Sequence, residues 1–150
     1  MMLVPNEVRD ALAGHPAVGE WDPMFPLLTV DDVGFPDVCL LGRAELDANS
    51  QHIDAVIVGS TTTANLQRDG RATLVVFGAE TATYCKLRAV GAPICDGPWS
   101  GFTFEVVAVK QDSADVAMEP SKFLPTHRLS TVEHWDTSRR LLRQLSRERP

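Results

Sequence analysis

Short apolar runs separated by turn-forming residues recur along most of the chain, and this pattern predicts a mainly β protein. Two acidic residues followed by Gly and Pro, at Asp31–Pro36, predict a hairpin turn between the first two runs. A segment rich in Pro and Gly, Gly91–Trp99, is expected to be a loop. The predicted strands are Phe25–Val30, Val38–Leu41, Ile53–Gly59, Arg71–Phe77, Thr81–Ala92 and Phe102–Val109.

Helical spacing occurs near the N-terminus and once between the predicted strands. Val8, Ala11 and Leu12 recur at the helical period, with Asn6 as the expected cap and Gly14 as the stop. A short helix is predicted over Ala64–Arg68. Because helices are few and no Gly-x-Gly-x-x-Gly follows a strand, a compact antiparallel barrel is favoured over a dinucleotide-binding α/β fold.

The C-terminal segment carries the strongest helical pattern, which predicts a helix at about 131–147. Ser130 and Glu133 have the spacing of a capping box. Arginines occupy much of the remaining surface of this helix. The expected apolar stripe consists of Val132, Trp135, Leu142 and Leu145.

Length and composition favour one globular domain spanning 1–150, since 44% of the 150 residues are hydrophobic and 23% are charged. No apolar stretch approaches the ~20 residues of a membrane helix, and the start lacks the pattern of a secretory signal. Cys39, Cys85 and Cys95 form no Cys-x-x-Cys pair and lie in or beside apolar runs. They are expected to be reduced core thiols of a cytoplasmic protein.

The net charge of −6 argues against a nucleic-acid partner for most of the surface. The charge is uneven, however. Residues 1–127 hold eight Lys/Arg against seventeen Asp/Glu, whereas residues 128–150 hold six Arg against three acidic residues. A nucleic-acid role for this basic tail remains a distant third hypothesis, since its pattern is that of an ordinary solvated helix.

The most distinctive polar segment is a run of four hydroxyl residues, Ser60–Thr63, between a buried strand and the predicted short helix. Hydroxyls and the free N–H groups of a helix start can bind a phosphate. The alternative is that the run only caps the helix. Arginines that could assist a phosphate site are Arg43, Arg68, Arg71 and Arg88.

Other chemistry has little support. The four histidines lack His-x-x-x-His spacing, and no carboxylate cluster completes a metal site. Ser60 is not in a Gly-x-Ser-x-Gly elbow, which argues against a serine hydrolase. No metal site and no catalytic dyad is therefore predicted.

Three segments taken together, in their order and spacing, resemble the pyridoxamine 5′-phosphate oxidase-like family of FMN-binding split barrels. They are the Phe25–Pro36 segment, the segment from Ser60 to Leu74, and Lys86–Ala92 followed by the last strand. The similarity covers about residues 24–110. It implies a six-stranded antiparallel split β-barrel with short helices at both ends. It also implies a homodimer with two FMN sites at the subunit interface.

The resemblance also implies the cofactor-binding residues. The candidate phosphate contacts are Ser60, Thr61, Thr62 and Thr63. The backbone of Val58 would lie beside the flavin ring, and Asn65 would brace the turn. Trp99 or Trp135 from the partner chain could close the slot around the ring.

True oxidases of this family carry basic residues where this chain has Asp37, Gly42, Thr61 and Thr62. This departure argues against vitamin B6 oxidase activity, although hydroxyl-rich turns also occur in smaller FMN-binding members. The first functional hypothesis is therefore an FMN-dependent oxidoreductase acting on a small molecule, in which the flavin supplies the chemistry. The second is a non-catalytic split-barrel dimer that binds a small ligand or scaffolds a partner.

Overall fold

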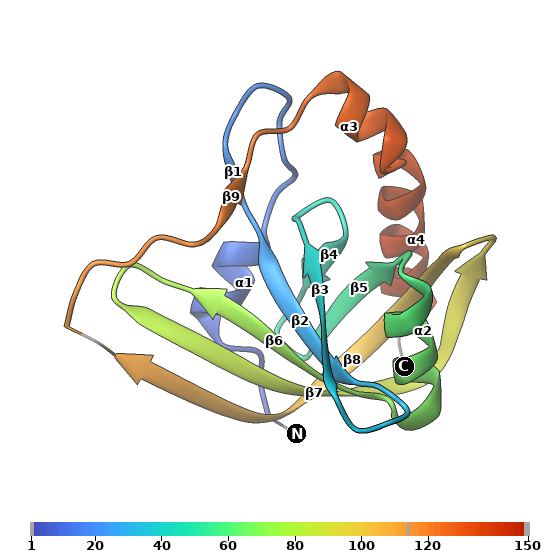
Figure 1. Cartoon of the computed structure of the whole chain (residues 1–150), viewed down its shortest axis with the longest axis horizontal. Coiled ribbons are helices and arrows are strands. Elements are labelled where there is room, and N and C mark those ends of the chain that lie inside the picture. Colours follow the sequence, from blue (N-terminus) through green and yellow to red (C-terminus); the bar gives the residue numbers. More distant parts are fainter. Residues whose placement is uncertain (1, 114, 149–150) are drawn as a thin grey trace.

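The computed structural model describes residues 2–113 and 115–148, and its main feature is a curled antiparallel sheet (Figure 1). Seven strands pair in the order β3-β2-β6-β7-β8-β5-β4. These are β2 (Phe25–Val30), β3 (Pro36–Leu41), β4 (Leu46–Ala48), β5 (His52–Ile57), β6 (Arg71–Phe77), β7 (Thr81–Asp96) and β8 (Trp99–Ser113). The two edge strands, β3 and β4, do not pair with each other, so the sheet is a half-barrel.

The predicted antiparallel, mainly β architecture is confirmed, but the count of six strands is wrong. A seventh strand, β4, joins the edge of the sheet, and a separate two-stranded sheet pairs β1 (Asp22–Pro23) with β9 (Lys122–Phe123). None of the predicted strands includes residues 47–50. Asp47 instead pairs with Asp54 of β5. The strand forms because β5 lies beside it and provides hydrogen-bond partners, which the local sequence of residues 47–50 does not indicate.

The region predicted as a loop over Gly91–Trp99 is instead the far end of a long hairpin. β7 continues to Asp96 and β8 begins at Trp99, so the reversal is confined to Gly97 and its neighbour. Gly97 has φ 58°, a value that favours glycine. The register between the strands shifts between Val90 and Ile94, so Gly91, which has φ 70°, lies in an unpaired bulge and the pairing resumes at Ile94.

Four helices flank the sheet: α1 (Asn6–Leu12), α2 (Ser60–Asp69), α3 (His127–Val132) and α4 (Trp135–Glu148). α1 has Pro5, not Asn6, at its N-cap, so the predicted cap is wrong. In the C-terminal region Thr126 caps α3 by accepting a hydrogen bond from the Leu129 N–H at 3.0 Å. Ser130 lies inside that helix and donates to the His127 carbonyl, so the predicted capping box does not form.

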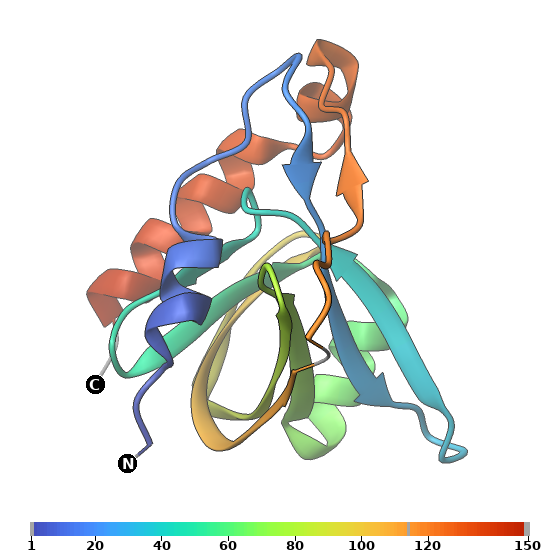
Figure 2. The same ribbon diagram turned by 90° about the vertical axis from the view of Figure 1, so that its left-hand side faces the viewer.

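The main core fills the concave side of the sheet. Its largest fully buried side chains include Phe104, Leu27, Ile53, Ile57 and Leu74. All six residues of β5 are buried because α4 covers the opposite face of that strand. Figure 2 shows α4 lying along the outside of the sheet.

The second cluster lies between α4 and the sheet, where Val56 of β5 packs with Leu141, Leu142 and Leu145. The predicted apolar stripe is correct for Trp135, Leu142 and Leu145. It is wrong for Val132, which lies on α3 with 63% of its surface exposed. The chain turns between the two helices at His134, which has φ 52°.

The three cysteines are free, as expected, but they are not all in the core. Cys85 is buried, Cys39 is half-buried and Cys95 is exposed. Cys95 lies in the extended β7–β8 hairpin, where the strands project beyond the core.

Candidate functional site

The first turn of α2 follows directly after β5 and leaves its backbone donors open. Gly59, the N-cap residue, has no side chain to accept from them. The first backbone bond of the turn runs from the Thr63 N–H to the Gly59 carbonyl at 3.0 Å. The N–H groups of Ser60, Thr61 and Thr62 therefore have no acceptor within the helix and point out of its positive end.

The four hydroxyl residues lie in this first turn but have different surroundings. Ser60 and Thr61 are exposed. Thr62 is buried, and its hydroxyl donates to Asp37 Oδ2 of β3 at 3.3 Å. The Thr63 Oγ1 atom is buried and has no hydrogen-bond partner among the described residues. Ser60 and Thr61 are thus the side chains most available to a ligand, whereas Thr62 is tied to the neighbouring strand.

Asn65 and Val58 lie on the two sides of this turn, and Asn65 is buried whereas Val58 is exposed. Asn65 is buried and donates through Nδ2 to Thr29 Oγ1 at 2.9 Å, which fixes α2 against β2. Val58 is 48% exposed and lies immediately before the helix. The predicted residues are therefore gathered at one junction by the sequence of strand, turn and helix.

The arginines considered as helpers are not at this junction. Arg43 pairs with Asp22 at 2.6 Å, and Arg88 pairs with Glu105. Arg68 is in the last turn of α2, where it bonds the Val30 carbonyl. Eight residues separate Arg68 from Ser60, which is about 12 Å along a helix. An anion at the start of α2 would depend on N–H groups and hydroxyls.

A cavity of about 260 Å³ opens beside the start of α2, between β3, β5 and the α3–α4 junction. Its wall is mostly apolar. Trp99 belongs to this chain's own wall, where its ring lies 4.8 Å from that of His134. Its Nε1 atom is buried without a partner in the described part of the chain. The lining residues are Cys39, Leu40, Leu41, Glu45, Val56, Val58, Gly59, Trp99, Val132 and Glu133.

Two carboxylates, those of Glu45 and Glu133, line this cavity. Burial, together with the nearby charge of Glu133, raises the pKa of Glu45 to about 7, although the Gly42 N–H donates to its Oε2 at 3.0 Å. Glu133 accepts from Trp135 Nε1 at 3.0 Å, which holds it in place. A carboxyl group with this pKa can gain or lose a proton near neutral pH.

Sequence reasoning missed Glu45 because nothing local distinguishes it. Its raised pKa comes first from burial and then from the charge of Glu133, which is far away in the chain and is brought near only by the fold. The thiol of Cys39 lies in the same cavity. Burial raises the pKa of Cys39, and its hydrogen bond with Thr62 opposes this rise, so the thiol is protonated at neutral pH.

Exposed apolar side chains surround the mouth of the cavity. Leu40, Val58 and Val132 line the cavity and have 55%, 48% and 63% of their surfaces exposed. Val38, on the same edge strand as Leu40, is 56% exposed. A group of exposed apolar residues beside a cavity is typical of a binding or assembly surface.

Solved structures share this fold. The styrene monooxygenase flavin reductase SMOB from Pseudomonas putida S12 superimposes with a TM-score of 0.55 at 9% identity, covering 79% of this chain and 93% of that one. Flavoredoxin of Desulfovibrio vulgaris gives 0.52 at 13% identity, over 75% and 87%. A FAD-binding protein from Mesorhizobium loti gives 0.51 at 12% identity, over 75% and 97%.

This chain therefore has the same fold as these three proteins, whose names describe a flavin reductase, a flavoredoxin and a FAD-binding protein. The resemblance noted in the sequence is confirmed at this level. The sequence matches no protein-family model and no curated protein. No helix in residues 2–113 and 115–148 is long and apolar enough to cross a membrane.

Proposed function

We propose that this protein is a flavoprotein of the split-barrel class that binds FMN at the start of α2 and transfers electrons to or from a small molecule. The observation that carries the proposal is the open N-terminus of α2 beside an apolar cavity. Free N–H groups and a helix dipole favour a phosphate at this position. The flavin-binding proteins that share the fold support the choice of cofactor.

The phosphate would be held by the N–H groups of the first turn and by the hydroxyls of Ser60 and Thr61. Thr62 and Asn65 would support the site without contacting the phosphate, since their hydrogen bonds to Asp37 and Thr29 fix the helix on the sheet. Thr63 completes the predicted set with a hydroxyl that is buried in the same turn. FMN fits this cradle because its single terminal phosphate needs only one such site.

The ring would lie against the apolar wall that includes Val58, Leu40 and Trp99. The cavity of about 260 Å³ is below the roughly 300–1,000 Å³ of ordinary ligand sites. Exposed apolar residues at its mouth could be covered by a second copy of the chain, which would enlarge and enclose the site. We therefore also propose a homodimer, with the flavin sites at its interface.

A bound flavin would supply the redox chemistry. The protein's own contribution would be to bind and orient it, to exclude water with the apolar wall, and to manage a proton. Glu45 is the group suited to that last role, because its pKa of about 7 leaves it partly protonated at neutral pH.

The second candidate function is a non-catalytic barrel dimer that binds another small ligand. The observation that favours it is the charge at the cradle. Asp37 is bonded to Thr62, while Arg43, Arg68 and Arg88 are engaged elsewhere and Arg71 begins β6, beyond the far end of α2. This alternative predicts that excess FMN leaves no bound flavin.

The test compares FMN with riboflavin, which lacks the phosphate, in titrations of the flavin-free protein followed by fluorescence quenching. Ser60→Glu places a carboxylate where the phosphate would bind, and negative charge at a helix start does not weaken the helix. Its matched control is Gln67→Glu, the same charge change at an exposed position in the same helix.

We expect Ser60→Glu to weaken FMN binding by about tenfold or more while riboflavin affinity stays within about twofold. Gln67→Glu should bind both ligands as the parent protein does. Failure of the parent protein to bind FMN would favour the non-catalytic alternative. Equal loss of FMN and riboflavin affinity in Ser60→Glu would show that the phosphate lies elsewhere.

A further inference from the structure

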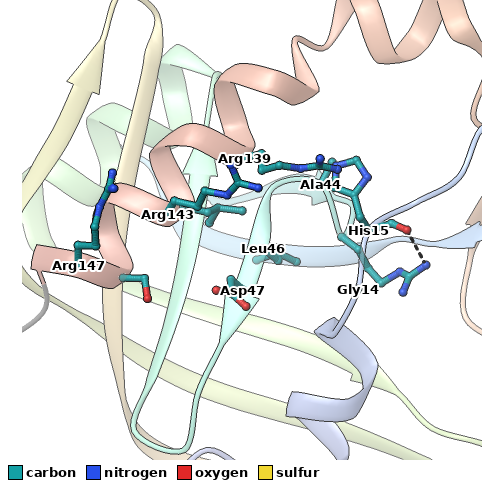
Figure 3. Close-up of a pocket in the computed structure, with 11 residues that line it drawn as sticks. Gly14, His15, Ala44, Leu46, Asp47, Arg139, Arg143 and Arg147 are labelled. Atoms are coloured by element: carbon teal, nitrogen blue, oxygen red, sulfur yellow. Dashed lines mark hydrogen bonds between the residues drawn. The ribbon is translucent and has the colours of Figure 1, made fainter.

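A second cavity, of about 510 Å³, lies between α4, β4 and the loop after α1, and its wall is strongly basic (Figure 3). Arg139, Arg143 and Arg147 line it from α4, and Arg43 lines it from the turn before β4. Figure 3 shows the α4 arginines in a row, with Arg139 nearest His15 and Arg147 farthest from it.

The three α4 arginines lie on one helix face at intervals of four residues. Like charges at this spacing repel one another and destabilise a helix. None of the three has an acidic partner among residues 2–113 and 115–148, whereas their neighbour Arg140 pairs with Asp96. The whole chain carries −6, so this concentration of positive charge is local. An anion bound between the arginines would relieve the repulsion.

Arg43 does not need such an anion, because it already holds the wall together. Its guanidinium contacts Asp22 at 2.6 Å and donates to the Ala13 carbonyl at 2.7 Å and to the His15 carbonyl at 3.4 Å. Gly14 has φ 94°, and a Cβ there would lie 2.6 Å from Arg43 Nη1. The loop that closes the cavity is therefore locked in position before any ligand arrives.

The remaining wall consists of His15, an apolar floor and one carboxylate. His15 Nδ1 contacts the Pro16 carbonyl at 3.0 Å and donates to it, while its Nε2 atom is buried without a partner in the described chain. Leu46 and Leu142 supply apolar surface. Among the described residues, Asp47 is the one carboxylate that lines the cavity, and it accepts from the Ala48 N–H at 2.9 Å.

We propose that this cavity binds a small organic anion with two or more phosphate groups, of the nucleoside diphosphate class. A guanidinium group can donate two parallel hydrogen bonds to two oxygens of one phosphate. Residues four positions apart along a helix are about 6 Å apart. A chain of phosphates can follow such a row, whereas a single phosphate would leave part of it unpaired. The apolar floor suits the base, and the volume is that of an ordinary small-molecule site.

This site is separate from the start of α2 and does not depend on the proposed flavin. Its test uses ADP and adenosine as probes in calorimetric titrations of the full chain. The site variant is Arg139→Gln with Arg143→Gln. The matched control is Arg128→Gln with Arg140→Gln, which removes the same charge from exposed positions outside the cavity.

We expect saturable one-to-one binding of ADP, at least about tenfold weaker binding of adenosine, and at least a tenfold loss of ADP affinity in the site variant. The control should stay within about threefold. Amide resonances of Leu46 and Ser146 should shift on ADP addition, which reports the location directly.

Absence of saturable binding by the parent protein would overturn the proposal. Equal losses in the site and control variants would also overturn it, because only general charge attraction would then be at work. If Ser60→Glu abolished ADP binding, the nucleotide would occupy the start of α2 instead. Unchanged far-ultraviolet circular dichroism in both double variants confirms that the fold is intact.

Discussion

Glu45 should make the protein less stable as the pH rises toward neutrality, and replacing it with Gln should remove this effect. Burial and Glu133 raise the pKa of Glu45 from 4.5 to about 7 in the folded chain. The folded state therefore binds this proton more tightly than the unfolded state does. The stability contributed by the protonated carboxyl is complete below pH 4.5 and is lost as the pH rises through about 7.

The size of the effect follows from the interval between the two pKa values. The rise from 4.5 to about 7 corresponds to a loss of up to about 3 kcal/mol by pH 8. Glu45→Gln keeps an oxygen that can accept from the Gly42 N–H but never ionises. We expect the variant to exceed the parent by less than about 1 kcal/mol at pH 5 and by about 3 kcal/mol at pH 8.

The assay is urea denaturation of both proteins at intervals from pH 5 to pH 8, followed by circular dichroism. Glu133→Gln removes the neighbouring charge and so lowers the folded-state pKa of Glu45, and its loss of stability should be smaller and should level off at a lower pH than in the parent. The exposed Glu20 gives a control, Glu20→Gln, whose pH dependence should match the parent. A stability difference between Glu45→Gln and the parent that stays constant from pH 5 to pH 8 would refute the reasoning.

Two further substitutions test the packing and the assembly. Leu141→Ala should destabilise the fold by about 2–5 kcal/mol in urea denaturation, because Leu141 is fully buried between α4 and β5. Leu124→Ala, at a side chain 44% exposed, should cost clearly less; similar costs would contradict the packing described. Leu40→Glu should give monomers in sedimentation at micromolar concentration, because it places a charge on the proposed dimer surface. The control Val33→Glu places the same charge on an exposed apolar residue away from the cavity and should leave the dimer intact. If both variants remained dimers, the interface would lie elsewhere.

Strands whose apolar residues are bounded by strong turn signals could be predicted to the residue. β2 and β6 have the predicted bounds Phe25–Val30 and Arg71–Phe77 because a Pro/Gly turn or an Asp-Gly pair stands next to each. Gly70, with φ 68°, ends α2. β4 and the end of the β7–β8 hairpin could not be predicted, since their order comes from neighbouring strands.

The residues of the candidate site likewise divide into those that the sequence could indicate and those that only the fold brings together. The hydroxyl run at Ser60 was visible because its residues are consecutive, although it forms the first turn of α2 and does not precede the helix. The pKa of Glu45 is raised only in the folded chain, where the side chain is buried and the C-terminal region brings Glu133 near it. The row of α4 arginines was visible as charge, but only the fold shows that it faces a cavity with His15.

The covering of β5 by α4 has a consequence for synthesis of the chain on the ribosome. Val56 is made well before Leu141 and Leu145, which shield it in the folded chain. Until they do, one face of a central strand remains exposed to water. A nascent or prematurely terminated chain ending before Trp135 would therefore expose apolar surface, and should be a preferred substrate for chaperones and proteases.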